Sequence, residues 1–177
     1  MKVAYILLED GFEEIEALTT CDILRRANVD CKLVGMKNIE VIGSHGIKIK
    51  TDLLFDHQLV DMVILPGGLP GATNLKDNLE VIEYLNQMNQ NQRWIAAICA
   101  APIVLSQAGV IENKKVTSYP GFEQEIICQQ YLEKNVVIDG NVITSRGPAT
   151  TFDFAYSLVE ILEINSKDLK QSMLYLG

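Results

Sequence analysis

Four short, almost unbroken apolar runs constrain the fold of this chain more than any other feature. They are Lys2–Leu8, Cys31–Val34, Asp61–Leu65 and Trp94–Ile98. Runs of this length suit strands that are buried on both faces of a parallel sheet, because a strand with one wet face alternates apolar and polar residues. Segments with helical periodicity separate these runs. The alternation predicts an α/β fold, a three-layer α/β/α sandwich around a mainly parallel sheet.

Turn and capping signals place the remaining elements. Helices are expected after Asp10 and Asp77, each of which has a glutamate three residues later in a capping-box spacing. Two hairpins appended to the sheet are expected, around the turns Gly43–Gly46 and Asp139–Asn141. Further helices are predicted over Gly121–Leu132, Thr150–Leu162 and Ser166–Met173.

Length and composition favour one domain over residues 1–177. The chain is 48% hydrophobic and 21% charged, and it is long enough to bury one core. A net charge of −8 argues against nucleic acid or an anionic membrane surface as partner. No apolar run approaches the ~20 residues of a membrane span, and the N-terminus is interpreted as a first strand, not a signal peptide. Four widely spaced cysteines predict neither a metal site nor a disulfide framework, and they suit a reducing cytoplasm.

The most suggestive of the four is Cys99, which directly follows the run Trp94–Ile98. A helical pattern opens after Pro102 and closes at Gly109. A thiol at such a strand-to-helix elbow lies over a helix N-terminus, whose partial positive charge favours the thiolate and lowers the thiol pKa. A free cysteine is also a common buried residue. The spacing alone leaves both interpretations open.

Two other loops are expected at the same edge of the sheet, because ligands of open α/β sheets bind beyond the carboxyl ends of the strands. The first follows the first strand and carries Glu13, Glu14 and Glu16. Acidic residues in a first helical turn often only complement the helix dipole, but Glu16 lies near the apolar stripe, where a carboxylate needs a partner or holds a proton. The second loop contains Gly67 and Gly68, which form either a simple turn or a pair of amides open to a reacting oxygen.

Four separated motifs together resemble the ThiJ/PfpI family, in the branch that includes the human Parkinson-disease-linked deglycase. They are Glu-Glu-Ile-Glu16, Leu-Pro-Gly-Gly68, Ala-Ala-Ile-Cys99-Ala-Ala-Pro and Thr-Ser-Arg-Gly-Pro148. The resemblance runs in order along nearly the whole chain. It implies a flavodoxin-like sandwich of the class I glutamine-amidotransferase-like superfamily, and a homodimer with the site near the interface.

The resemblance also assigns roles to residues. Cys99 would be the reactive elbow cysteine and Glu16 its protonated partner. Gly67, Gly68 and Ala100 would supply oxyanion-hole amides. Tyr119, Glu13, Arg146 and His45 are placed in the substrate pocket, with His45 expected near Glu13 or Glu14 of the neighbouring subunit. No metal and no cofactor are expected.

Two departures from the family pattern narrow the function. PfpI-type proteases carry His directly after the cysteine, where this chain has Ala100, so protease activity is not expected. Glyoxalase-competent members usually carry His where this chain has Tyr119, and a phenol with a pKa near ~10 is a poorer proton shuttle at neutral pH than an imidazole. Weak activity is therefore expected.

The leading hypothesis is a cofactor-independent, stress-protective enzyme acting on reactive carbonyls, as a glyoxalase or deglycase. Its partners would be small carbonyls or glycated thiols and amines. The alternative is a redox-sensing or chaperone-like protective protein in which Cys99 oxidises to a sulfinate with little or no turnover.

Overall fold

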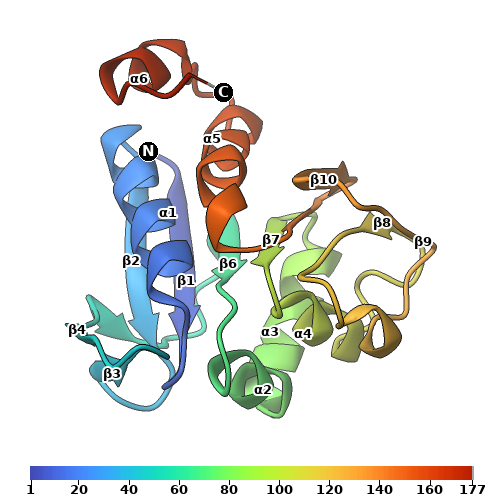
Figure 1. Cartoon of the computed structure of the whole chain (residues 1–177). Helices are drawn as coiled ribbons and strands as arrows, with labels where there is room; N and C mark the ends of the chain where they lie inside the picture. The colour runs from blue at the N-terminus through green and yellow to red at the C-terminus, as the bar shows by residue number, and fades with distance from the viewer. Residues whose placement is uncertain (177) are drawn as a thin grey trace.

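The computed structural model describes residues 1–176 and contains a mainly parallel central sheet (Figure 1). The seven strands of this sheet within the described residues run in the order β10-β11-β7-β6-β1-β2-β5, and only β10 is antiparallel to its neighbour. Their bounds are β1 Val3–Leu8, β2 Asp30–Gly35, β5 Leu53–Leu54, β6 Met62–Leu65, β7 Trp94–Ile98, β10 Val136–Asp139 and β11 Val142–Ser145. All four apolar runs are strands of this sheet, as predicted.

Helices cover both faces of the sheet, so the predicted flavodoxin-like α/β/α sandwich is confirmed (Figure 1). One face carries α1 (Glu14–Arg26) and α5 (Thr151–Ile161); the other carries α2 (Gly71–Lys76), α3 (Leu79–Gln90) and α4 (Pro102–Gln107). Alternate residues of each strand enter opposite cores, because successive side chains of a strand point to opposite faces. In β1, Ile6 packs on the α1 side and Leu7 on the α3 side, both fully buried.

Two hairpins and a terminal helix complete the fold. The hairpin of β3 (Glu40–Ile42) and β4 (Lys48–Lys50) stands apart from the main sheet, and β10 and β11 form the second hairpin at the sheet edge. Both turns and the helices α5 and α6 (Lys167–Ser172) lie where the sequence predicted them. Among the described residues, no helix has the length and apolarity to cross a membrane.

The segment Gly121–Leu132 is not the predicted helix. It contains a short 3-10 turn over Glu123–Glu125 and then β9 (Gln130–Tyr131), which pairs with β8 (Lys115–Val116). The pairing with β8 is a tertiary interaction, and it overrides the local helical preference of the segment.

Both capping boxes also differ from their prediction. The N-cap of α1 is Glu13 in place of Asp10, and that of α3 is Asn78 in place of Asp77. The side chain of Asp10 instead accepts a hydrogen bond from the backbone N–H of Ile42, at 2.9 Å, and so attaches the β3–β4 hairpin. The short helix α2 ends at the residue before Asp77 and was not expected from the sequence.

Candidate active site at the strand-to-helix elbow

Cys99 occupies a sharp turn between β7 and α4. Its φ of +64° lies in the left-handed region, which a residue with a side chain adopts at a cost of about 1–3 kcal/mol when the surroundings enforce it. The backbone on both sides is fixed. Cys99 N–H donates to Ser145 O at 3.0 Å, and Tyr119 N–H donates to Cys99 O at 2.9 Å. The sequence therefore predicted the position of the elbow, and two neighbouring segments hold its strained conformation.

Glu16 lies beside this thiol in the first turn of α1, with only 1% of its surface exposed. Its Oε2 accepts a hydrogen bond from the backbone N–H of Gly67 at 2.7 Å, and its side chain interacts with the Cys99 thiol. Its Oε1 is buried and accepts no hydrogen bond from a nitrogen or oxygen of the described residues. A buried carboxyl oxygen without a donor favours a protonated carboxyl group. The structure thus brings the predicted Cys99–Glu16 pair together.

Burial governs the protonation of the pair. It raises the pKa of Glu16 to about 7, against the opposing effect of the Gly67 hydrogen bond and the Cys99 contact. Burial also raises the pKa of the Cys99 thiol, and an ionised Glu16 raises it further, whereas the N–H groups of Ala100 and Gly68 lower it. Two acids in one buried site do not both ionise at neutral pH, so the pair carries at most one negative charge.

The lowered pKa expected for Cys99 is therefore wrong. Helix α4 begins at Pro102, three residues beyond the thiol, and proline contributes no N–H to the helix terminus. At the sulfur, the helix end lowers the thiol pKa by less than burial and the adjacent carboxylate raise it. The pKa of Glu16, and not that of Cys99, lies near neutrality.

The three amides predicted for an oxyanion hole have two different functions. The N–H of Gly67 binds Glu16, so it is not available to a substrate oxygen, and the prediction for Gly67 is wrong. The N–H groups of Gly68 and Ala100 face the Cys99 sulfur, as the prediction requires. Gly67 is nonetheless needed as glycine, since a Cβ there would lie 2.6 Å from the Cβ of Cys99.

The structure places Tyr119 beside Cys99 and Glu13 beside Glu16. Tyr119 binds Cys99 through its backbone, its side chain is half-exposed, and its ring lies against Gly147. Glu13 is buried and accepts a hydrogen bond from Glu16 N–H at 2.7 Å, so its carboxylate orients the first turn of α1. Arg146 lies 3.9 Å from the exposed carboxylate of Glu133.

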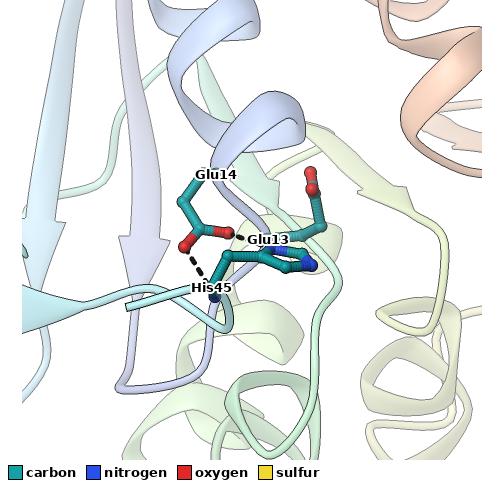
Figure 2. A group of neighbouring side chains, drawn as sticks. All are labelled: Glu13, Glu14 and His45. Atoms are coloured by element: carbon teal, nitrogen blue, oxygen red, sulfur yellow. Dashed lines mark hydrogen bonds and ion pairs between the residues drawn. The ribbon is translucent and has the colours of Figure 1, made fainter. Parts of the chain in front are cut away.

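His45 has a partner in its own chain. Its Nδ1 lies 2.8 Å from Glu14 Oε2, and its backbone N–H donates to Glu14 Oε1 at 2.7 Å (Figure 2). The hairpin turn thus folds back on α1 of the same chain, and the pairing of His45 with a neighbouring subunit stays a prediction. Against the opposing effect of burial, these bonds lower the pKa of Glu14 to about 2, and the Glu14 hydrogen bond raises the pKa of His45.

Glu13, Glu14 and His45 also form a group whose ligand atoms lie within 4.8 Å of one another (Figure 2). Both carboxylates already accept hydrogen bonds from protein donors, including Ser44 Oγ at 3.2 Å from Glu14 Oε2. The contribution of Ser44 was missed by the sequence analysis, although the serine precedes His45 in the predicted turn. We interpret this group as an ion pair that attaches the hairpin.

A large cavity of about 930 Å³ lies elsewhere, at the C-terminal end of the chain between α5 and α6. Its lining contains no cysteine and no residue of the Cys99–Glu16 pair. The size of a cavity alone does not identify an active site, whereas a strained nucleophile beside a titrating carboxyl group does. The elbow is therefore the candidate active site.

Fold and site together define a class of protein: a flavodoxin-like α/β sandwich with a cysteine on a strained strand-to-helix elbow and a buried glutamate beside it. The chain belongs to the DJ-1/PfpI family, whose family model matches residues 1–161.

Curated relatives agree with this assignment. The Parkinson disease protein 7 homolog of Danio rerio is 38% identical over 169 residues, which are 91% of this chain and 89% of that protein. Deglycase PH1704 of Pyrococcus horikoshii is 29% identical over 168 residues, 92% of this chain and 100% of that protein. The longer Protein DJ-1 homolog B of Arabidopsis thaliana is 34% identical over 170 residues, 93% of this chain but 39% of that protein. Among solved structures, oxidized Toxoplasma gondii DJ-1 superposes with a TM-score of 0.95 at 29% identity, and each chain is covered completely.

Proposed function

We propose that this protein is a cofactor-independent glyoxalase or deglycase-like enzyme that acts on small reactive carbonyls or their adducts with thiols and amines. The observation that carries the proposal is the elbow itself. It combines a nucleophile (Cys99), a carboxyl group that titrates near neutrality (Glu16), and two amides beside the sulfur. The name of the Pyrococcus relative, a deglycase, supports the reaction class.

The proposed reaction begins with transfer of the thiol proton to the Glu16 carboxylate while Sγ of Cys99 attacks the aldehyde carbon. An S–C bond forms, and the carbonyl oxygen gains negative charge, which the N–H groups of Gly68 and Ala100 stabilise. The oxygen then takes this proton from Glu16, which gives a hemithioacetal and restores the Glu16 carboxylate. A general acid–base residue works best with a pKa near the working pH, and Glu16 meets this condition at about 7.

For a 2-oxoaldehyde the same carboxyl group completes the reaction. Glu16 removes the proton from the former aldehyde carbon and returns it to the neighbouring carbonyl carbon, while the hydroxyl proton passes from the first oxygen to the second. The adduct thereby becomes a thioester of a 2-hydroxy acid. Water then cleaves the thioester and restores the thiol. For a glycated thiol or amine, hydrolysis instead releases the free thiol or amine. No external oxidant or reductant is needed.

The decisive experiment measures methylglyoxal consumption by the purified protein. Wild type should be active, Cys99→Ser should be inactive, and Cys128→Ser, a matched change at a thiol outside the elbow, should keep wild-type activity. Equal activity of wild type and Cys99→Ser would refute the proposal.

A second experiment tests the departure at Tyr119. If proton transfer limits the rate because a phenol replaces the usual imidazole, Tyr119→His should raise turnover by at least a few-fold. A fast wild-type enzyme that loses its activity on this substitution would show instead that the Tyr119 hydroxyl group binds substrate.

A redox-protective function is the second candidate. In this case Cys99 is oxidised by two equivalents of peroxide to a sulfinate, and the protonated Oε1 of Glu16 donates to a sulfinate oxygen. The buried Oε1 without a hydrogen-bond donor supports this candidate. It predicts two added oxygens at Cys99 after mild peroxide treatment, together with negligible methylglyoxal turnover before treatment.

A further inference from the structure

A pair of thiols lies in the core, far along the chain from the elbow cysteine. Cys21 is on α1 and Cys31 is on β2, and both belong to the apolar core between α1 and the sheet. They are 4% and 1% exposed, and each side chain interacts with the other. Neither takes part in the proposed reaction at Cys99.

Helix geometry explains why these two thiols meet. Residues four apart lie on the same helix face, so Cys21 and Arg25 stack on the face of α1 that covers β2. Arg25 fixes the alignment, because its Nε donates to the backbone oxygen of Cys31 at 2.9 Å. Both thiols therefore face the same core between α1 and β2, and each side chain interacts with the other, which is the proximity that a disulfide needs.

The surroundings make the two thiols unequal and bring a surface pocket to one of them. The Cys31 thiol and the Arg25 guanidinium lower the pKa of Cys21, while the contact with Cys21 raises the pKa of Cys31. The thiolate is the form that reacts with peroxides. A surface pocket of about 410 Å³ is lined by Cys31, Arg25 and Asp52, among others, so it reaches the Cys31 side of the pair.

We propose that Cys21 and Cys31 form a reversible disulfide when the protein meets a small peroxide. The Cys21 thiolate attacks one peroxide oxygen, the O–O bond breaks, and Cys21 becomes a sulfenic acid while the peroxide leaves as water or an alcohol after protonation. The Cys31 sulfur then attacks the sulfenic sulfur, an S–S bond forms, and water leaves. Two electrons pass from the two thiols to the peroxide. The product links the C-terminal half of α1 to β2.

Peptide mapping tests the proposal directly. Trypsin cleaves after Lys2, Arg25, Arg26 and Lys32, so Cys21 and Cys31 fall in separate peptides, 3–25 and 27–32. The Cys99→Ser protein is treated with hydrogen peroxide, its remaining thiols are blocked with N-ethylmaleimide under denaturing conditions, and the digest is analysed by mass spectrometry. The two peptides should appear joined, with the loss of two hydrogens, and should separate on reduction. Because Cys99 is absent, the result does not depend on the proposed carbonyl chemistry.

Two controls make the outcome decisive. In Cys21→Ser the joined species should disappear and Cys31 should remain open to alkylation. Arg25→Gln should slow the joining several-fold, whereas Arg26→Gln, a matched change one residue further whose Nε binds Asp22, should not. The proposal fails if both thiols stay open to alkylation at peroxide doses that oxidise Cys99 in wild type, or if Cys21 joins Cys128 instead.

Discussion

Gly67 determines the geometry of the candidate site at the scale of a single residue. A Cβ at this position would lie 2.6 Å from the Cβ of Cys99 and 2.8 Å from Oε2 of Glu16. Gly67→Ala should therefore force the thiol and the carboxyl group apart while the sheet remains intact. A displacement of about 1 Å at a reacting group can cost roughly 100-fold in rate. We expect a loss of this order in methylglyoxal turnover with an unchanged circular dichroism spectrum; full turnover would show that the site tolerates the extra atom.

After burial, the Glu16 carboxylate is the second cause of the raised pKa of the Cys99 thiol. Because the ionised carboxylate is among the causes that raise the pKa of Cys99, Glu16→Gln should lower that pKa. It should also abolish turnover, because the amide cannot accept the thiol proton. Thiolate absorbance against pH measures the first effect and methylglyoxal consumption the second. A Cys99 pKa that rises in this variant would mean that Glu16 stabilises the thiolate by donating a proton to it.

At the scale of elements, a few directed hydrogen bonds hold the β3–β4 hairpin on the first turn of α1 and on the loop that precedes it. Gly11 N–H donates to Ile42 O at 2.7 Å, Ser44 N–H donates to Phe12 O at 2.8 Å, and Glu14 binds His45. The raised pKa of His45 makes its contribution complete below the reference pKa of ~6.5, and that contribution is lost as pH rises through the raised value. The lowered pKa of Glu14 makes its contribution complete above ~4.3, and that is lost as pH falls through about 2.

The attachment should thus be strongest between about pH 4.5 and 6.5. Glu14→Gln should bring the pKa of His45 down towards its reference value, which an NMR titration of the imidazole signals measures. His57, in a different loop, supplies the control signal. Unchanged titration of His45 in the variant would contradict the ion pair.

The N-terminus of α3 offers a test of the corrected cap. Asn78 accepts a hydrogen bond from Glu80 N–H at 3.0 Å, whereas Asp77 is exposed and follows the end of α2. Asn78→Ala should lower the free energy of unfolding by about 1 kcal/mol. Asp77→Ala, the matched control, should change it by less than half as much. Denaturant titration measures both, and the reverse order would restore the capping box predicted from the sequence.

At the scale of the whole molecule, the expected homodimer has a candidate surface. Large apolar side chains are exposed on α1 and on the attached hairpin, namely Ile15, Ile42 and Ile47. Exposed apolar residues that gather on neighbouring elements are typical of an interface. Sedimentation equilibrium should give twice the chain mass of 19.7 kDa. Ile47→Asp should shift the protein towards monomer, whereas Ile138→Asp, at an equally exposed isoleucine on β10, should not; a wild-type monomer would remove the prediction.

Local sequence was sufficient for most of the sheet and for the position of the elbow. Apolar runs such as Trp94–Ile98 can satisfy burial on both faces only inside a parallel sheet, and a glycine-containing turn such as Asp139–Asn141 fixes a hairpin within a few residues. Cys99 then follows from its position at the end of a buried strand. These signals involve residues close in sequence, so they can be recognised without knowledge of the rest of the chain.

Tertiary structure decided everything that depends on residues distant in sequence. The amide of Gly67 binds Glu16 across 51 positions, and the partner of His45 lies 31 positions away. The segment Gly121–Leu132 pairs with β8 in place of forming a helix. The direction of the Cys99 pKa depends on how deeply the thiol is buried and on a carboxyl group from another element. The burial of a group and the electric field at that group depend on the whole surrounding fold, so a local sequence pattern cannot predict them.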